Sequence, residues 1–275
     1  MFLTYDIAQQ KLVADSADKK ILEFLSAIRG FQNDQMKSLN AKQLLIIAQR
    51  LGLTEASVRM ALSRQTKQGK LLRVKGRYML ASSQKEYLLP RFWLDIKSRS
   101  IDWQGDWLLV NVASQKLGAT VSRRLSVKAE LLGLKYIPAL GWIRPNNLLN
   151  LREEVLYHFQ QFVDESNILI AQLAHISPEW EQQFCSNWSP QALNQFYQNS
   201  VKFMQTEISN MTNLDDDQVL IRSFTIGRLL VEYLSKDPWL PERLIDLQAR
   251  SELVNEASKL YQLIKPAWMN VLVNR

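Results

Sequence analysis

The side chains with the clearest chemistry lie in one short basic segment, residues 54–80. It contains a single acidic residue, Glu55, and seven basic ones: Arg59, Arg64, Lys67, Lys70, Arg73, Lys75 and Arg77. Arginine and lysine bind phosphate groups, and arginine also reads guanine edges in the major groove of DNA. The segment therefore predicts a site for a polyanion.

The charge of the whole chain is unevenly distributed. Residues 1–100 carry 18 Lys and Arg against 8 Asp and Glu, a net charge of +10, whereas the remaining residues have a net charge of −3. A polyanion that docks on the N-terminal third explains this asymmetry. The alternative is an ordinary solvated basic surface.

The elements that must position the basic side chains follow a helix-turn-helix pattern. Apolar residues at helical spacing predict helices over residues 18–29 and 40–51, the second with Asn40 as its N-cap. Thr54 is a good N-cap for a third helix, and Gly69 ends that helix. The tight connection between the second and third helices is typical of a helix-turn-helix.

The third predicted helix has two different faces. At about 100° per residue, the face expected to pack inward contains Val58, Ala61, Leu62 and Gln65. The other face contains Ala56, Arg59, Met60, Ser63 and Lys67, with Ser57 and Arg64 on its flank. Because these polar groups suit base edges and phosphates, we predict that this helix contacts DNA through Ser57, Arg59, Met60, Ser63, Arg64 and Lys67.

A β-hairpin is predicted directly after this helix. Residues 71–80 contain two short apolar runs, and Lys75-Gly76 between them fits a tight turn. Such a hairpin is a wing, and Arg73, Lys75 and Arg77 near its tip are expected to contact phosphates or the minor groove. The region therefore predicts a winged helix-turn-helix that binds double-stranded DNA. Winged folds also serve as protein-contact modules, in which the helix face is usually less basic.

The middle of the chain predicts a domain of the ferredoxin-like type. Strands and helices are expected in the order β-α-β-β-α-β, over residues 107–113, 120–134, 135–145 (two strands), 151–165 and 167–176. Domains of this kind often form dimers or hold regulatory ligands, but the fold alone decides neither.

Four residues of this domain form a candidate ligand site. Arg123 and Arg124 suit phosphate, and the indoles of Trp107 and Trp142 suit an aromatic acyl group. The alternative, which we prefer, is a solvated arginine pair with tryptophans in the core.

The remaining sequence, residues 177–275, predicts helices throughout. The fold class is therefore α+β and multidomain: a winged helix-turn-helix domain (1–95), a ferredoxin-like domain (96–176) and a helical domain (177–275). The sequence has no apolar run long enough to cross a membrane, no signal-peptide pattern at its start, and a lone cysteine, Cys185. We expect a soluble cytoplasmic protein.

Motifs of common enzyme classes are missing from the sequence. It has no GxGxxG after a strand, no GxxxxGK[ST], no HExxH and no GxSxG. Its only histidines are His158 and His175, too few for most metal sites. A metal-dependent nuclease needs clustered carboxylates, and the strand over 107–113 contains none, although Asp102 and Asp106 precede it. We therefore expect no enzyme activity, no metal and no cofactor.

Three blocks of the sequence resemble the PaaX family, repressors of phenylacetate-catabolism genes. They are SVRMALSRQTKQGKL (57–71) with the following GRYML, WQGDWLLV (103–110) with SRRLSVKAELLGLKYIPALGWIRP (122–145), and IGRLLVEYLSKDPWLPERLI (226–245). The resemblance implies an N-terminal winged domain, a middle domain similar to the Cas2 ferredoxin-like fold, and a helical C-terminal domain.

The resemblance also implies a function. It implies a homodimeric repressor that leaves its operator when it binds an aryl-CoA thioester, typically phenylacetyl-CoA. Arg59, Ser63 and Arg64 match the recognition-helix core of the family. Met60 and Gln65 depart from the family pattern, which leaves the operator sequence open. The chain also lacks the tryptophan-glycine step expected after the DPWLP segment, so a regulator that answers to another acyl-CoA, or that activates transcription, remains an alternative.

Overall fold

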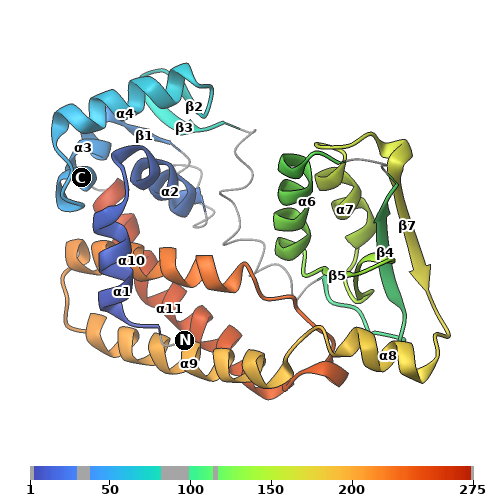
Figure 1. Cartoon of the computed structure of the whole chain (residues 1–275). Helices are drawn as coiled ribbons and strands as arrows, with labels where there is room; N and C mark the ends of the chain where they lie inside the picture. The colour runs from blue at the N-terminus through green and yellow to red at the C-terminus, as the bar shows by residue number, and fades with distance from the viewer. Residues whose placement is uncertain (1–2, 30–37, 82–98, 114–116, 274–275) are drawn as a thin grey trace. The chain divides into compact units, whose positions relative to one another are not determined.

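The computed structural model of the chain describes residues 3–29, 38–81, 99–113 and 117–273. The protein is α+β, with two small antiparallel sheets among many helices (Figure 1), and the predicted α+β class is confirmed. No helix within the described ranges is long and apolar enough to cross a membrane.

The described residues belong to two compact units. Unit 1 combines three separate parts of the sequence, taken from Met1–Leu94, Phe196–Glu232 and Arg250–Arg275. Unit 2 is taken from Asp95–Gln195 and Tyr233–Ala249. The division into three consecutive domains stays a prediction, and its first boundary, between residues 95 and 96, lies outside the described residues.

Unit 1 contains all the elements that surround the basic segment. From its N-terminal part these are α1 (Tyr5–Ala14), α2 (Ala17–Arg29), β1 (Leu39–Asn40), α3 (Ala41–Arg50), α4 (Glu55–Lys67), β2 (Leu71–Val74) and β3 (Arg77–Leu80). The three strands form an antiparallel sheet in the order β1-β3-β2. Most of α9 (Pro190–Met211), α10 (Asp216–Leu234) and α11 (Leu247–Val273) complete the unit.

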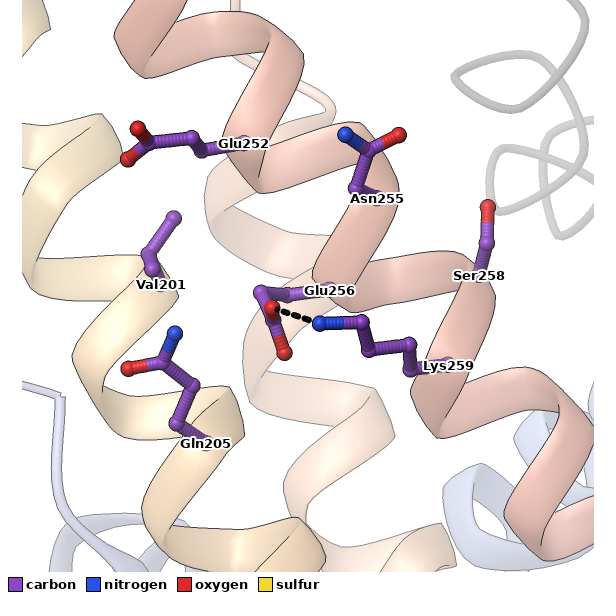
Figure 2. A pocket seen from close by; sticks show the side chains of 7 residues that line it. All are labelled: Val201, Gln205, Glu252, Asn255, Glu256, Ser258 and Lys259. Atoms are coloured by element: carbon purple, nitrogen blue, oxygen red, sulfur yellow. Dashed lines mark hydrogen bonds and ion pairs between the residues drawn. The ribbon is translucent and has the colours of Figure 1, made fainter.

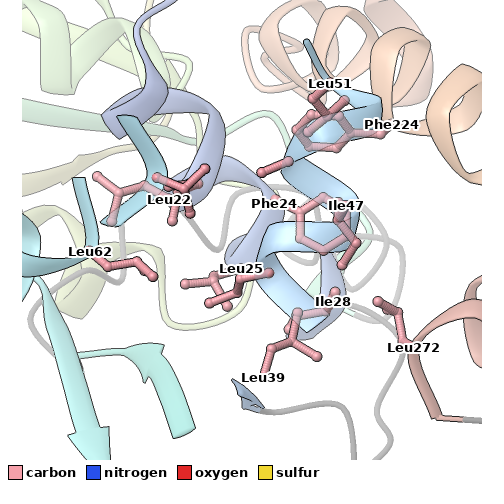
Figure 3. Packing of buried hydrophobic residues seen from close by; sticks show 14 of the residues in the cluster. Leu22, Phe24, Leu25, Ile28, Leu39, Ile47, Leu51, Leu62, Phe224 and Leu272 are labelled. Carbon is pink, nitrogen blue, oxygen red and sulfur yellow. The ribbon is translucent and has the colours of Figure 1, made fainter. Parts of the chain in front are cut away.

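The N-terminal and C-terminal helices of unit 1 share one hydrophobic core (Figure 3). Phe24 of α2 packs edge-to-face on Phe224 of α10, with ring centroids 5.3 Å apart. The same ring stacks on Trp268 of α11 at 5.1 Å. The indole of Trp268 donates a hydrogen bond of 2.8 Å to Ser223 Oγ, so its one polar atom is satisfied within the core. The elements around α4 are therefore held by helices that come more than a hundred residues later in the sequence.

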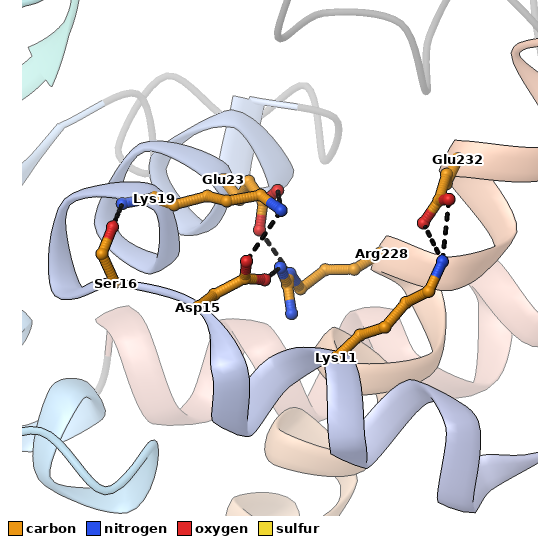
Figure 4. A network of polar contacts seen from close by, with 7 residues as sticks. All are labelled: Lys11, Asp15, Ser16, Lys19, Glu23, Arg228 and Glu232. Carbon is orange, nitrogen blue, oxygen red and sulfur yellow. Dashed lines mark hydrogen bonds and ion pairs between the residues drawn. The ribbon is translucent and has the colours of Figure 1, made fainter.

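A polar network also joins the N-terminal helices to α10 (Figure 4). The guanidinium of Arg228 pairs with the carboxylates of Asp15 and Glu23, and Lys19 approaches Asp15 at 2.8 Å. Burial raises the pKa of Asp15, but hydrogen bonds and attraction from Lys19 and Arg228 outweigh burial and lower it overall. Asp15 is therefore held in its charged form.

Unit 2 contains the second sheet. Its elements are β4 (Trp107–Val112), α6 (Ala119–Leu131), β5 (Lys135–Ile137), β6 (Gly141–Pro145), α7 (Leu151–Phe159), η3 (Glu165–Asn167), β7 (Ile168–Leu173), α8 (Pro178–Cys185) and η4 (Glu242–Leu244). The strands form an antiparallel sheet in the order β5-β6-β4-β7, and α6 and α7 lie on one side of it (Figure 1). Gly141 is required where β6 begins, because a Cβ there would lie 2.4 Å from the carbonyl oxygen of Val110.

A buried arginine ties the segment between α10 and α11 to this sheet. Arg144 is 2% exposed and donates hydrogen bonds to the carbonyl oxygens of Leu132 (2.5 Å) and Pro238 (3.1 Å) and to Asn147 Oδ1 (3.0 Å). Asn147 in turn donates to the carbonyl oxygen of Trp239 at 2.9 Å. Burial lowers the pKa of Arg144 to about 10, and its charge is satisfied mainly by neutral acceptors.

Candidate nucleic-acid interface

The helix α4 has the two faces that its sequence predicts. Val58, Ala61, Leu62 and Gln65 are all buried. The opposite face is exposed: the side chain of Arg59 is 66% accessible and Met60 is 62% exposed, and Ser63, Arg64 and Lys67 are exposed beside them. This face of α4 is therefore accessible to a partner.

Local capping sets where α4 begins. The hydroxyl of Thr54 accepts a hydrogen bond of 3.2 Å from the backbone N–H of Ser57, as expected for an N-cap. The hydroxyl of Ser57 donates to the carbonyl oxygen of Thr54 at 2.8 Å. Ser57 is thus engaged at the start of the helix. The preceding helix, α3, begins at a complete capping box between Asn40 and Gln43.

The hairpin after α4 turns at Lys75-Gly76, as predicted. Both residues have positive φ, 49° and 76°, which is the requirement of a two-residue type I′ turn. Arg73 pairs with Tyr78 and Val74 with Arg77 across the hairpin. Lys75 is exposed at the tip, so the sheet presents a cation at its far end.

A hollow lies between α3, α4 and the hairpin. It is lined by Ala41, Leu45, Arg59, Leu62, Ser63, Thr66, Lys67, Arg73 and Tyr78. Three cations, two hydroxyls and a tyrosine converge there above apolar side chains, and no carboxylate lines it. The guanidinium of Arg73 lies 5.5 Å from the ring centroid of Tyr78, which holds it beside α4. Such a hollow suits a phosphate or the edge of a base.

Two polar residues of this hollow, Thr66 and Tyr78, are not among the DNA contacts predicted from the sequence. Thr66 lies one helical turn after Ser63, so the phase of α4 was the signal that could have found it. The position of Tyr78 could have been predicted from the turn, because a two-residue turn at 75–76 places residue 78 opposite Arg73.

Besides Ser57, three of the predicted DNA contacts, all arginines, have hydrogen-bond partners within the chain. Arg64 donates from Nε and Nη2 to the two carboxylate oxygens of Asp18, at 2.8 and 2.9 Å, and these bonds raise its pKa. Arg77 donates to the hydroxyl and the carbonyl oxygen of Ser38, at 2.8 and 2.6 Å. These contacts hold α4 to α2 and the hairpin to the segment before β1. Arg59 also has an intrachain partner, Glu55, but that pair is on the exposed surface.

The four residues of the candidate ligand site are not brought together. Trp107 is 0% exposed and packs on Trp103, Phe184 and Trp188. Trp142 lies on the opposite face of the sheet and packs on Tyr136 and Phe159. Arg123 and Arg124 are exposed on α6. Both tryptophans thus occupy core positions, which agrees with the alternative preferred from the sequence.

A second hollow in unit 1 lies between α9 and α11 (Figure 2). Its lining is polar and of mixed charge: Val201, Gln205, Glu252, Asn255, Glu256, Ser258 and Lys259. Lys259 pairs with Glu256 at 2.6 Å within the hollow. Because these opposite charges neutralise each other, we assign no ligand to it. Within the described residues, no group of three or more His, Cys, Asp and Glu side chains is placed to hold a metal ion.

Comparisons with known proteins give a likeness of fold. No family model matches the sequence, and no curated protein matches it. Among solved structures, the chain is similar to the uncharacterized protein Rv0674 from Mycobacterium tuberculosis, with a TM-score of 0.53 and 18% sequence identity. The similarity covers 89% of this chain and 96% of that one, so it extends over both units.

Proposed function

We propose that the protein is a DNA-binding transcriptional regulator whose residues 38–81 form a winged helix-turn-helix. In this proposal α4 enters the major groove, and the β2–β3 hairpin is the wing that holds the backbone. The observation that carries the proposal is the hollow in which Arg59, Lys67 and Arg73 converge beside an exposed helix face.

Each exposed residue of this surface has a role that its chemistry suits. Arg59 and Ser63 reach base edges, and the thioether of Met60 meets a thymine methyl group. Lys67, Arg73 and Lys75 hold phosphates. When Arg59 contacts DNA, it gives up its exposed ion pair with Glu55. The loss costs little free energy because surface ion pairs are weak. Arg64 and Arg77 mainly hold α4 and the wing in place through Asp18 and Ser38.

We further propose that the regulator is a homodimeric repressor, released from its operator by an aryl-CoA thioester such as phenylacetyl-CoA. The resemblance to the PaaX family supports this, as does unit 2, whose strand order β5-β6-β4-β7 is that of a ferredoxin-like domain. Of the candidate ligand residues, the exposed pair Arg123 and Arg124 suits the phosphates of coenzyme A. A dimer places its two α4 helices about 34 Å apart, or a multiple of that, on a partly palindromic operator.

A fluorescence-anisotropy titration tests the proposal. The probe is the DNA upstream of the protein's own gene and its neighbours, at physiological salt and with unrelated DNA as competitor. Phenylacetyl-CoA and other acyl-CoAs are then added to the complex. The matched control is Lys202→Ala, which removes one exposed charge from α9 of the same unit, and which we expect to bind like the native protein.

The outcomes separate the parts of the proposal. Competitor-resistant binding released by one thioester supports both the DNA role and the effector. If the DNA is released by a different acyl-CoA, or is not released by any, the DNA-binding role stands and phenylacetyl-CoA is rejected as the effector. Binding no tighter than to competitor DNA rejects the regulator and favours a protein-contact module. Loss of the probe with a divalent metal ion present favours a nuclease.

A further inference from the structure

The β2–β3 hairpin turns one of its two faces toward the hydrophobic core of unit 1. Leu71 and Leu80 lie directly opposite each other on this face, and each is only 1% exposed. Arg73 and Tyr78 form the next pair on the same face, because side chains two residues apart along a strand point the same way. Val74, on the other face, is 51% exposed. The guanidinium and the phenol are therefore directed toward the hollow between α3, α4 and the hairpin.

The helix α4 contributes the opposite wall of this hollow. Arg59, Ser63 and Lys67 line it at intervals of four residues, the spacing at which side chains share one side of a helix. Within the described residues, neither Lys67 nor Arg73 donates a hydrogen bond to an acceptor. Arg59 pairs only with Glu55, on the exposed surface. Three cations thus surround one hollow, and an anion placed between them relieves their mutual repulsion.

The hydrogen-bonding groups of the hollow are mostly donors. The hydroxyl of Thr66 is already engaged, since it donates to the carbonyl oxygen of Leu62 at 2.7 Å. The phenol hydroxyl of Tyr78 makes no hydrogen bond within the described residues, so it is able to donate. Among the described residues, no carboxylate or amide side chain lines the hollow. A fitting ligand brings several acceptors and a negative charge, whereas the edges of adenine and cytosine each bring an amino donor.

We propose that this hollow is a site for one phosphate group, which it binds whether or not DNA is present. Lys67 and Arg73 neutralise the charge of the phosphate. The phenol of Tyr78, whose ring lies against the guanidinium of Arg73, donates to a phosphate oxygen. The hollow has a volume of about 530 Å³, within the range of small-molecule pockets, so the group that carries the phosphate fits as well.

The chemistry of the site fits two sources of phosphate. One source is a phosphodiester of the DNA backbone, and the other is a small phosphorylated molecule. The first source rests on the proposed function, whereas the phosphate site itself does not. Phosphate binding is therefore measured first without DNA, and the source is distinguished afterwards.

Isothermal titration calorimetry of the full chain with sodium pyrophosphate tests the site itself. Sodium chloride keeps the ionic strength constant, so that general screening does not change. We expect saturable binding that is weakened about tenfold or more by Arg73→Gln and by Tyr78→Phe, because each variant loses a hydrogen bond to a charged group. The matched control is Lys70→Gln, which removes a cation of the same segment that does not line the hollow. We expect this control to bind like the native protein.

Two results of this titration overturn the proposal. One is the absence of saturable binding by the native protein. The other is equal weakening by Lys70→Gln and Arg73→Gln, because the basic segment then attracts anions only through its overall charge. If Tyr78→Phe binds pyrophosphate as tightly as the native protein, the role of the phenol is overturned.

Pyrophosphate added to the DNA complex, again at constant ionic strength, distinguishes the two sources. Displacement of DNA from the native protein, with much weaker displacement from Tyr78→Phe, assigns the hollow to a backbone phosphate. Pyrophosphate binding without displacement assigns it to a small phosphorylated molecule. A protein that binds pyrophosphate and no DNA keeps the phosphate site and rejects the proposed function. Specific DNA binding by a protein that does not bind pyrophosphate rejects the phosphate site alone.

Discussion

At the scale of single residues, the basic segment separates into two groups of cations. Arg64 and Arg77 are committed to Asp18 and Ser38, whereas Lys67 and Lys75 have no ion pair within the described residues. Because a cation that already has a bidentate partner gains less from phosphate, the second group, with Arg59, is expected to carry most of the DNA affinity.

Arg59→Ala tests base reading by a single side chain. We expect it to cost about 1–3 kcal/mol of specific binding while nonspecific binding changes little. Competition anisotropy with operator and unrelated DNA measures both affinities, and Lys202→Ala serves as the control. An unchanged ratio of specific to nonspecific affinity contradicts the role.

Asp15→Asn tests the polar network that holds α2 to α10. The pKa of Asp15 is lowered in the folded protein from its ordinary value of 3.8. Its stabilising effect is therefore fully present above that value and is lost as the pH falls below it toward the folded pKa. Urea unfolding from pH 7 to pH 3 measures the unfolding free energies of the native chain and of the Asp15→Asn variant. We expect the difference between them to be constant near neutral pH and to become smaller as the pH falls into the acid range.

The control for this series is Asp102→Asn, a change at an exposed carboxylate outside the network. We expect its unfolding free energy to follow that of the native protein at every pH. A gap for Asp15→Asn that stays constant down to pH 3 would show that Asp15 does not stabilise the fold through its charge.

At the scale of elements, the proposed wing is a two-stranded hairpin with the exposed cation Lys75 at its tip. Lys75→Ala is expected to weaken binding to all DNA about equally and to reduce the salt slope by about one. Anisotropy titrations over a range of salt concentrations measure that slope. The same slope in the variant and the native protein would mean that the wing tip does not touch phosphate.

The elements of the proposed DNA-binding surface follow from local signals in the sequence. Apolar spacing predicts the helices. Thr54, Gly69 and the Lys75-Gly76 turn act on their immediate neighbours and mark where the elements begin and end. The partners of Arg64 and Arg77 could not be predicted, because Asp18 and Ser38 are 46 and 39 residues away. The ligand site was assembled from residue types alone, and strand alternation sends Trp107 and Trp142 to opposite faces of the sheet.

The helix over 151–165 was predicted longer than the observed α7, which ends at Phe159. Its apolar stripe continues through Phe162, but Phe162 and Val163 bond back to the carbonyl oxygen of Phe159 in turns. The short strand β1 was not predicted, because two residues carry no periodic signal. Its pairing with β3 depends on the hairpin being formed.

At the scale of the whole molecule, the proposed DNA-binding region shares its hydrophobic core with α10 and α11. Trp268 of α11 is 2% exposed and stacks on Phe24 of α2. Trp268→Ala is expected to cost about 3–5 kcal/mol of stability, a large part of the roughly 5–15 kcal/mol typical of a folded domain. We expect DNA binding to fall with the folded fraction, although Trp268 is far from α4 in the sequence.

Urea unfolding followed by circular dichroism measures this effect. The control is Trp180→Ala, the same change at a residue that is 42% exposed, with an expected cost under about 1 kcal/mol. Equal losses of unfolding free energy from the two substitutions would show that the shared core does not stabilise unit 1.

Unit 1 combines N-terminal and C-terminal parts of the sequence, and this has a consequence for its folding during protein synthesis. A ribosome adds roughly 5–20 residues per second, so the segment with α4 waits on the order of 10–40 s before Trp268 is made. During that interval Phe24 and its neighbours lack the aromatic partner that covers them. A nascent chain, or a fragment from interrupted translation, therefore carries the basic helix without the support that holds it in position. Under the proposed function, a chain translated through α11 would bind DNA, and a shorter fragment would lack the support that such binding needs.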